Sequence, residues 1–66
     1  MRLAVNGEER EVQGPLSVEA LLRELGVSPA GVAVAVNRRL VGAKERGARL
    51  LAAGDEVEIV RAAPGG

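Results

Sequence analysis

One stretch of the sequence, residues 16–26, limits the possible folds more than any other, because it predicts a single short amphipathic helix. Ser17 is placed to act as N-cap, and Gly26 is placed to end the helix in the left-handed conformation. Leu16 and Leu21 occupy the two positions of a hydrophobic staple around that cap. One apolar stripe runs along the helix, formed by Val18, Leu21, Leu22 and Leu25. A single stripe covers only one face of another layer, so strands must supply the rest of the core.

Two strands joined by a tight turn are predicted before the helix. Residues 1–5 alternate between apolar and other side chains, which is the period of a half-buried strand. Asn6 and Gly7 both tolerate positive φ and favour a two-residue type I′ turn. Residues 8–12 then form a returning strand rich in charged side chains, as expected of an edge strand that resists pairing with other chains.

A second hairpin is predicted after the helix. Residues 32–36 alternate valine with alanine, so we expect the valines to pack on the helix and the alanines to form a weakly apolar face opposite. Residues 37–39 are expected to form a turn, and Leu40 and Val41 a short fourth strand.

The remaining sequence ends in one more strand. Residues 42–53 show no clear period, and we expect a short helical turn there, with Leu50 and Leu51 closing the bottom of the core. Residues 56–61 predict the last strand, with Val57 and Ile59 facing inward.

The order hairpin, helix, hairpin and final strand predicts an α+β domain of the β-grasp, or ubiquitin-like, class. A crossover through the helix between parallel strands must be right-handed. We expect a mixed sheet of four to five strands, with the last strand in its middle and one main helix packed on one face. Residues 1–61 are expected to form this domain, and residues 62–66 a flexible C-terminal tail.

The composition excludes several classes of function. The 66 residues include no cysteine, histidine or aromatic side chain, so we expect neither a catalytic site nor a metal site. Nine basic and nine acidic side chains balance, and no ring is available to stack on a base, so nucleic-acid binding is not expected. The sequence shows neither a long apolar run nor a signal-peptide pattern, which predicts a cytoplasmic protein without membrane contact. A small binding or carrier module remains.

The tail suggests how such a carrier could work. Pro64 lacks an amide for a strand ladder and biases Ala63 toward an extended conformation, so the chain should leave the sheet here. Five extended residues reach about 17 Å, far enough to enter the active site of a partner. Gly65 and Gly66 lack Cβ atoms and would pass through a narrow channel. The terminal carboxylate of Gly66 is then the most plausible reactive group, once ATP converts it to a mixed anhydride.

Features along the whole chain resemble the ThiS family, the sulfur-carrier proteins of thiamin biosynthesis. They are Val5-Asn6-Gly7-Glu8, the capped helix around Leu21-Leu22, the strand from Val32 to Asn37, Leu51 followed by Gly54 to Val60, and terminal Gly65-Gly66. No single motif is specific, but their order and spacing are. Pro64 departs from the family pattern, in which another small flexible residue is common, and it affects how the tail would thread.

The resemblance implies a function and a set of partners. A ThiF-type adenylyltransferase would adenylate Gly66 with ATP and magnesium, and a persulfide enzyme would supply the sulfur that makes the thiocarboxylate. Ala63, Pro64 and Gly65 would thread into the partner's site. Thiazole synthase, ThiG, would take the sulfur for the thiazole ring. The chain would be a regenerated cosubstrate that binds no cofactor, and not an enzyme.

Other functions fit the same residues. Related carriers serve molybdopterin synthesis, tRNA thiolation or cysteine synthesis, although this chain is short and lacks the aromatic residues expected of a molybdopterin synthase subunit. A plain ubiquitin-like interaction module, or a protein modifier joined to lysines through Gly66, belongs to a different class.

A partner-docking face is also predicted. Ala4, Ala33, Ala35 and Val60 should share the sheet face opposite the helix, within a ring of charged residues formed by Arg2, Glu56 and Glu58. Arg61 joins these candidates because it lies next to the tail. The face is either an ordinary solvent surface or a docking patch for the activating enzyme, since a smooth and weakly apolar area costs little to desolvate.

Overall fold

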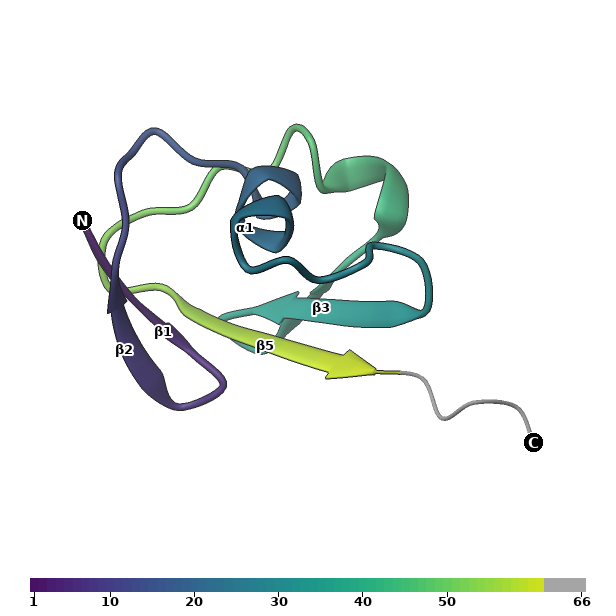
Figure 1. The fold of residues 1–66 in the computed structure, drawn as a ribbon, viewed down its shortest axis with the longest axis horizontal. Helices are drawn as coiled ribbons and strands as arrows, with labels where there is room; N and C mark the ends of the chain where they lie inside the picture. The colour runs from purple at the N-terminus through teal and green to yellow at the C-terminus, as the bar shows by residue number, and fades with distance from the viewer. Residues whose placement is uncertain (62–66) are drawn as a thin grey trace.

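The computed structural model describes residues 1–61, which form one mixed sheet with one helix packed on one of its faces (Figure 1). In chain order the elements are β1 (Arg2–Val5), β2 (Glu8–Glu11), α1 (Val18–Glu24), β3 (Val32–Val36), β4 (Arg39–Val41), the 3₁₀ turn η1 (Ala43–Glu45) and β5 (Glu56–Arg61). The five strands lie in the order β2-β1-β5-β3-β4. This arrangement confirms the predicted β-grasp class, with β2 as a charged edge strand and β5 in the middle.

Both hairpins turn through two residues with positive φ. Asn6 and Gly7 have φ of 49° and 84°, as the type I′ prediction requires. Asn37 and Arg38 have φ of 51° and 69°, so this turn is also two residues long. The predicted three-residue turn was wrong at its end, because Arg39 is already the first residue of β4 and stands opposite Val36.

The helix α1 begins and ends as predicted. The Ser17 hydroxyl accepts a hydrogen bond from the Ala20 amide at 3.0 Å. At the other end the amides of Gly26 and Val27 donate to the carbonyls of Arg23 and Leu22, at 3.1 and 3.0 Å. With Gly26 at φ 70°, these two bonds form a complete Schellman motif.

The core lies between α1 and the inner face of the sheet and is entirely aliphatic. Its fully buried members are Leu3, Leu21, Leu22, Val18, Val34, Val36 and Val57. Leu51 is also buried, as predicted, but the expectation for Leu50 was wrong because its side chain is 57% exposed. Leu50 forms a β-bridge with Ser17, and neighbouring residues of an extended segment point to opposite sides. Only one of the two leucines can therefore face the core.

The segment between β4 and β5 is held by main-chain hydrogen bonds to the start of α1. The amide of Val18 donates to the Arg49 carbonyl at 2.9 Å, and the amide of Leu51 donates to the Leu16 carbonyl at 2.8 Å. η1 is the short helical turn expected in this region, and the Glu45 carboxylate accepts from the Gly42 amide at 3.0 Å.

Candidate functional site

The central strand β5 leads directly toward the predicted reactive residue. β5 pairs in parallel with β1 and antiparallel with β3, so strands hold it on both sides. It ends at Arg61, the last residue that the structure describes. Ala63, Pro64, Gly65 and Gly66, the residues predicted for threading and modification, lie outside the described residues.

Asparagine side chains from both hairpin turns hold the backbone of β5. Asn37 Oδ1 accepts from the Glu56 amide at 2.9 Å, and Asn6 Oδ1 accepts from the Ile59 amide at 2.8 Å. The first bond lies at the start of the strand and the second lies near its end. The asparagine side chains therefore bind the main chain of β5 at the points where the two hairpins turn away from it.

The sheet face opposite the helix carries an apolar area at the β3–β4 side. Residues directly opposite each other in an antiparallel pair share a face, and Ala33 stands opposite Val60 while Ala35 stands opposite Leu40. Leu40 and Val60 are 74% and 62% exposed. We call Ala33, Ala35, Leu40 and Val60 the outer patch.

The outer patch differs from the predicted docking face at three positions, because it gains Leu40 and lacks Ala4 and Arg61. Leu40 belongs to it and was not among the predicted residues, because a two-residue strand motif does not reveal which face each residue takes. Arg61 does not belong to it. Side chains alternate along β5, so Arg61 lies on the helix side with Val57 and Ile59, where it lines a hollow with Leu25 and Val27.

The other half of this sheet face, toward β1 and β2, is charged. Ala4 stands opposite Glu9 on β2 and next to Glu56 on β5. Arg2 lies 3.4 Å from Glu9 and 3.6 Å from Glu11. β1, with Ala4, lies on one side of β5, and β3 lies on the other. There Ala35 of β3 stands opposite Glu58 of β5. The outer patch is thus bordered by carboxylates on its β5 side, and Ala4 lies within the charged half.

Glu11 at this charged edge also binds the amino group of Met1. Its Oε2 lies 3.1 Å from the ammonium nitrogen, which donates to the Val12 carbonyl at 2.7 Å. The hydrogen bond and the charge of this ammonium, followed by the Arg2 guanidinium, hold the pKa of the Glu11 carboxyl below its ordinary value. These contacts of the Met1 ammonium with Glu11 and Val12 join the two chain segments at the open end of the β1–β2 hairpin.

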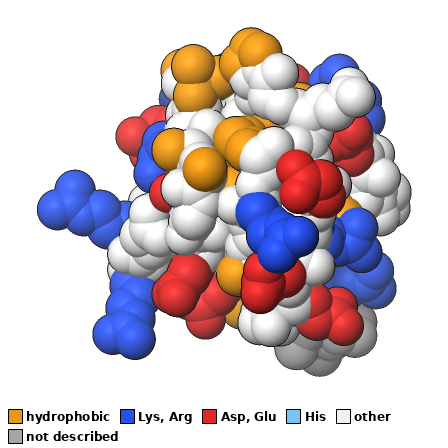
Figure 2. All heavy atoms as spheres, turned by 90° about the vertical axis from the view of Figure 1, so that its left-hand side faces the viewer, with side chains coloured by type: hydrophobic (Ala, Val, Ile, Leu, Met, Phe, Trp, Pro, Cys, Tyr) orange, Lys and Arg blue, Asp and Glu red, His pale blue; other side chains and the backbone are white. Residues whose placement is uncertain are grey.

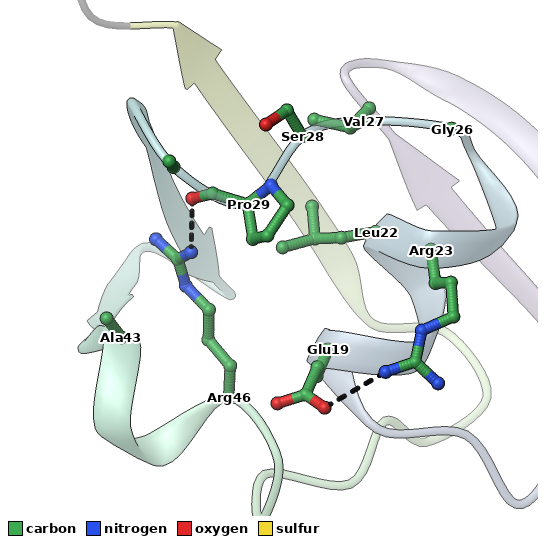
Figure 3. Close-up of a pocket in the computed structure, with 10 residues that line it drawn as sticks. Glu19, Leu22, Arg23, Gly26, Val27, Ser28, Pro29, Ala43 and Arg46 are labelled. Atoms are coloured by element: carbon green, nitrogen blue, oxygen red, sulfur yellow. Dashed lines mark hydrogen bonds and ion pairs between the residues drawn. The ribbon is translucent and has the colours of Figure 1, made fainter.

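A hollow of about 630 Å³ lies on the helix side, between α1, the loop after it and η1 (Figure 3). Figure 3 shows Arg46 and Glu19 next to each other at the bottom of this hollow, with Leu22 and Pro29 above them, and the Glu19 amide donates to the Arg46 carbonyl at 3.0 Å. Arg46 is only 7% exposed, and its Nη1 and Nη2 atoms donate to the carbonyls of Pro29 and Val32 at 3.0 and 2.7 Å. It therefore ties the loop after the helix to the segment after β4.

Arg46 was not predicted to be buried, and no signal in the sequence indicates it. The residue stands between Glu45 and Gly47 in a polar stretch typical of solvent-exposed turns. Its Nε atom has no hydrogen-bond partner among the described atoms, and no ion pair within residues 1–61 includes it. Its role in the fold comes from two carbonyl groups and not from a carboxylate.

The described part of the chain contains no group of three or more residues arranged to hold a metal ion. Figure 2 shows acidic and basic side chains interspersed on the side of the molecule that lies at the left of Figure 1, with no broad area of one sign. Neither helix found within residues 1–61 has the length and apolar character needed to cross a bilayer.

Five strands in the order β2-β1-β5-β3-β4 and one helix define a ubiquitin-like β-grasp domain. The model of the ThiS family matches residues 3–66, and the chain therefore belongs to the ThiS family, a family of small sulfur-carrier proteins. A crystal structure of the thiamine biosynthesis protein ThiS from Geobacter metallireducens has a TM-score of 0.86 and 35% identity, with both chains covered completely. A solution structure of a thiamine biosynthesis protein from the same organism has a TM-score of 0.82 and 33% identity, covering all of this chain and 88% of the other.

Two curated relatives are longer proteins. The thiazole synthase of Paramagnetospirillum magneticum is 42% identical and that of Magnetococcus marinus 35% identical, each over all 66 residues of this chain. The match covers 20% of each relative, so the chain spans about one fifth of their length. A domain similar to this one therefore occurs within proteins named for thiazole synthesis.

Proposed function

We propose that this chain carries sulfur as a thiocarboxylate on Gly66 and donates it for the thiazole ring of thiamin. The observation that carries the proposal is that the ThiS family match extends through residue 66 and so includes Gly65 and Gly66. The position of β5 supports it, because the central strand of the sheet runs directly into the residues that precede this pair. The chain itself acts as a regenerated cosubstrate and not as an enzyme.

The chemistry takes place in two stages at the carboxyl group of Gly66. A carboxylate oxygen attacks the α-phosphorus of ATP, which forms the acyl adenylate and releases pyrophosphate. A persulfide on a donor enzyme then displaces AMP, and reduction of the resulting acyl disulfide by a thiol leaves the thiocarboxylate. ATP and magnesium belong to a ThiF-type adenylyltransferase, and this chain contributes the acyl group alone.

The receiving partner is a thiazole synthase of the ThiG type. The two curated relatives named thiazole synthase support this pairing, since each contains a segment similar to this whole chain. The outer patch is the docking surface for the activating enzyme, because its exposed Leu40 and Val60 offer apolar area at little desolvation cost. All of these steps are expected in the cytoplasm.

An intact-mass measurement tests the central step. The protein, with Gly66 as its last residue, is incubated with ATP, magnesium, the cognate adenylyltransferase, a persulfide donor and a thiol. We expect the mass increase of one oxygen replaced by one sulfur. A variant without Gly66 should show no increase, while its thermal unfolding stays nearly unchanged because the buried core of the described residues ends at Val57. Sulfur on the truncated protein would overturn the assignment of Gly66.

A genetic test addresses the pathway. Deletion of the gene should cause a requirement for thiamin, or for its thiazole part, in cells without a second carrier. Growth without thiamin, together with loss of a molybdenum cofactor or of a thiolated tRNA, would instead assign the chain to another sulfur pathway. A mass that never changes would favour a ubiquitin-like interaction module.

A further inference from the structure

A hollow lies on the helix side of the sheet at the point where β5 leaves the domain. Its volume is about 280 Å³, and we call it the tail-root notch. Its lining consists of Val5, Asn6, Glu8, Arg10, Leu25, Val27, Ile59 and Arg61. Because Arg61 is the residue from which the chain continues toward Gly66, the notch lies beside the point where a partner that binds the following residues would meet the domain.

The main chain of β5 has an open edge beside the notch. β1 pairs with β5 only at Glu56 and Val57, and Asn6 then binds the main chain of Ile59 through its side chain. Main-chain groups alternate between the two sides of a strand, so those of Arg61 point to the same side as those of Ile59. No strand within residues 1–61 stands opposite Arg61 there. Figure 1 shows β5 continuing past the β1–β2 turn.

The notch combines a partly buried apolar floor with exposed cationic groups. Leu25, Val27 and Ile59 are packed against the core and remain partly accessible. Arg10 and Arg61 are exposed, and neither forms an ion pair within residues 1–61. With Glu8 as the single acidic residue, the lining carries a net charge of +1 from two arginines and one glutamate. A complementary surface would present a carboxylate.

On the basis of the function proposed above, we propose that an extended segment of the activating adenylyltransferase occupies the tail-root notch. This segment adds to β5 as a short strand at Arg61 and places an acidic side chain near Arg10 and Arg61. Strand addition pairs the main-chain groups of Arg61 that no strand within residues 1–61 reaches on this side, and the carboxylate aligns the carrier so that the following residues enter the active site. The notch lies on the opposite sheet face from the outer patch. The enzyme therefore contacts the domain on both faces of the sheet, at the outer patch and at the tail-root notch.

Charge reversal tests this contact through ATP–pyrophosphate exchange, with carrier concentration varied against the cognate adenylyltransferase. Arg61→Glu and Arg10→Glu should each raise the KM for the carrier roughly tenfold, with a smaller change in kcat, because the rim charges act on association. Arg39→Glu is the matched control, since it reverses an exposed strand arginine at the other edge of the sheet. Its KM should change less than twofold. Thermal unfolding of all three variants checks the fold.

Amide hydrogen exchange tests the added strand. Saturating wild-type carrier with the adenylyltransferase, without ATP, should slow exchange of the Arg61 amide at least tenfold. An unchanged exchange rate at Arg61, or reversal variants whose KM values equal that of the wild type, would overturn the notch contact while leaving Gly66 activation intact. Wild-type carrier that supports no exchange of pyrophosphate at all would overturn the proposed function together with this contact.

Discussion

The side chain of Asn6 makes both main-chain hydrogen bonds of Ile59, a residue 53 positions away in the sequence. Its Oδ1 accepts from the Ile59 amide at 2.8 Å, and its Nδ2 donates to the Ile59 carbonyl at 3.3 Å. The amide of Asn6 itself donates to the Val57 carbonyl at 2.8 Å, which is the last main-chain bond from β1 to β5. The asparagine side chain thus continues the ladder by one step after β1 has turned away.

We predict that Asn6→Gly lowers the free energy of unfolding by about 1 kcal/mol, because glycine keeps the positive φ but removes both bonds to Ile59. Asn6→Ala should cost about 1 kcal/mol more, since alanine also opposes the left-handed conformation. Urea unfolding of the two variants separates these effects. Equal stability of the glycine variant and the wild type would show that the bonds to Ile59 contribute nothing.

The same residue shows where prediction from sequence succeeds and where it ends. Asn6 followed by Gly7 predicts a two-residue turn, because turn preference depends on two adjacent residues, and the turn is as predicted. Its bonds to Ile59 depend on a strand that is adjacent only after folding. Local patterns in the same way predicted the capped helix and the inward valines of β3. The alternation that places Val57 and Ile59 inward also places Arg61 on the helix side, so the sequence pattern itself spoke against including Arg61 in the docking face.

The residues of the candidate site also fall into those that a local sequence pattern predicts and those that depend on contacts between distant segments. The alanine face of β3 follows from strict alternation and was predicted, whereas Leu40 lies in a strand of three residues that is too short to show a period. The burial of Arg46 depends on two carbonyls, Pro29 and Val32, in a loop far from it in sequence. No local signal distinguishes this arginine from the exposed Lys44 nearby.

Gly26 offers a test of the helix end. Its φ is 70°, and a Cβ built at this position meets nothing within 4 Å. We therefore predict that Gly26→Ala lowers the free energy of unfolding by about 1 kcal/mol for conformational reasons alone. In a chemically synthesised chain, D-alanine should instead stabilise the protein slightly, because it favours positive φ and restricts the unfolded chain. If urea unfolding shows that L-alanine and D-alanine lower the free energy of unfolding equally, steric contacts of the Cβ atom and not the backbone conformation cause the destabilisation.

Arg46 should contribute to stability through its two carbonyl partners. We predict that Arg46→Met, which keeps much of the aliphatic volume, lowers the free energy of unfolding by about 2 kcal/mol because the Pro29 and Val32 carbonyls lose their donors. Lys44→Met, at an exposed position on η1, should change it by less than about 0.5 kcal/mol. Urea unfolding measures both. A methionine variant as stable as the wild type would mean that water replaces the guanidinium without loss.

Glu11 should make stability depend on pH. Its pKa is lowered in the folded protein, mainly by the Met1 ammonium, so its contribution is present above the ordinary value of 4.5 and is lost as the pH falls through the folded pKa. The difference in melting temperature between the wild type and Glu11→Gln should therefore be largest near neutral pH and disappear in acid. Glu24→Gln, which removes a carboxylate without an ion pair among the described residues, is the control. A difference that grows in acid would contradict the assigned direction.

The outer patch leads to the last prediction, which concerns partner binding. Leu40→Ser and Val60→Ser remove exposed apolar side chains that contribute little to the core, so the fold should tolerate both changes. If this surface docks the activating enzyme, each should raise the KM for the carrier in ATP–pyrophosphate exchange by about five- to tenfold, as expected for loss of an apolar contact worth roughly 1 kcal/mol.

Leu50→Ser is a closely matched control, because Leu50 is 57% exposed but lies outside the patch, beside Ser17. Ala35→Glu is a less suitable test, since it would place a carboxylate directly opposite Glu58 and destabilise the sheet by like-charge repulsion. Equal KM values for Leu40→Ser, Leu50→Ser and the wild type would show that the outer patch is an ordinary solvent-exposed surface and does not bind the activating enzyme. A loss at Leu40 and Val60 but not at Leu50 would instead place the activating enzyme on the β3–β4 side of the face, where no carboxylate of β2 interferes.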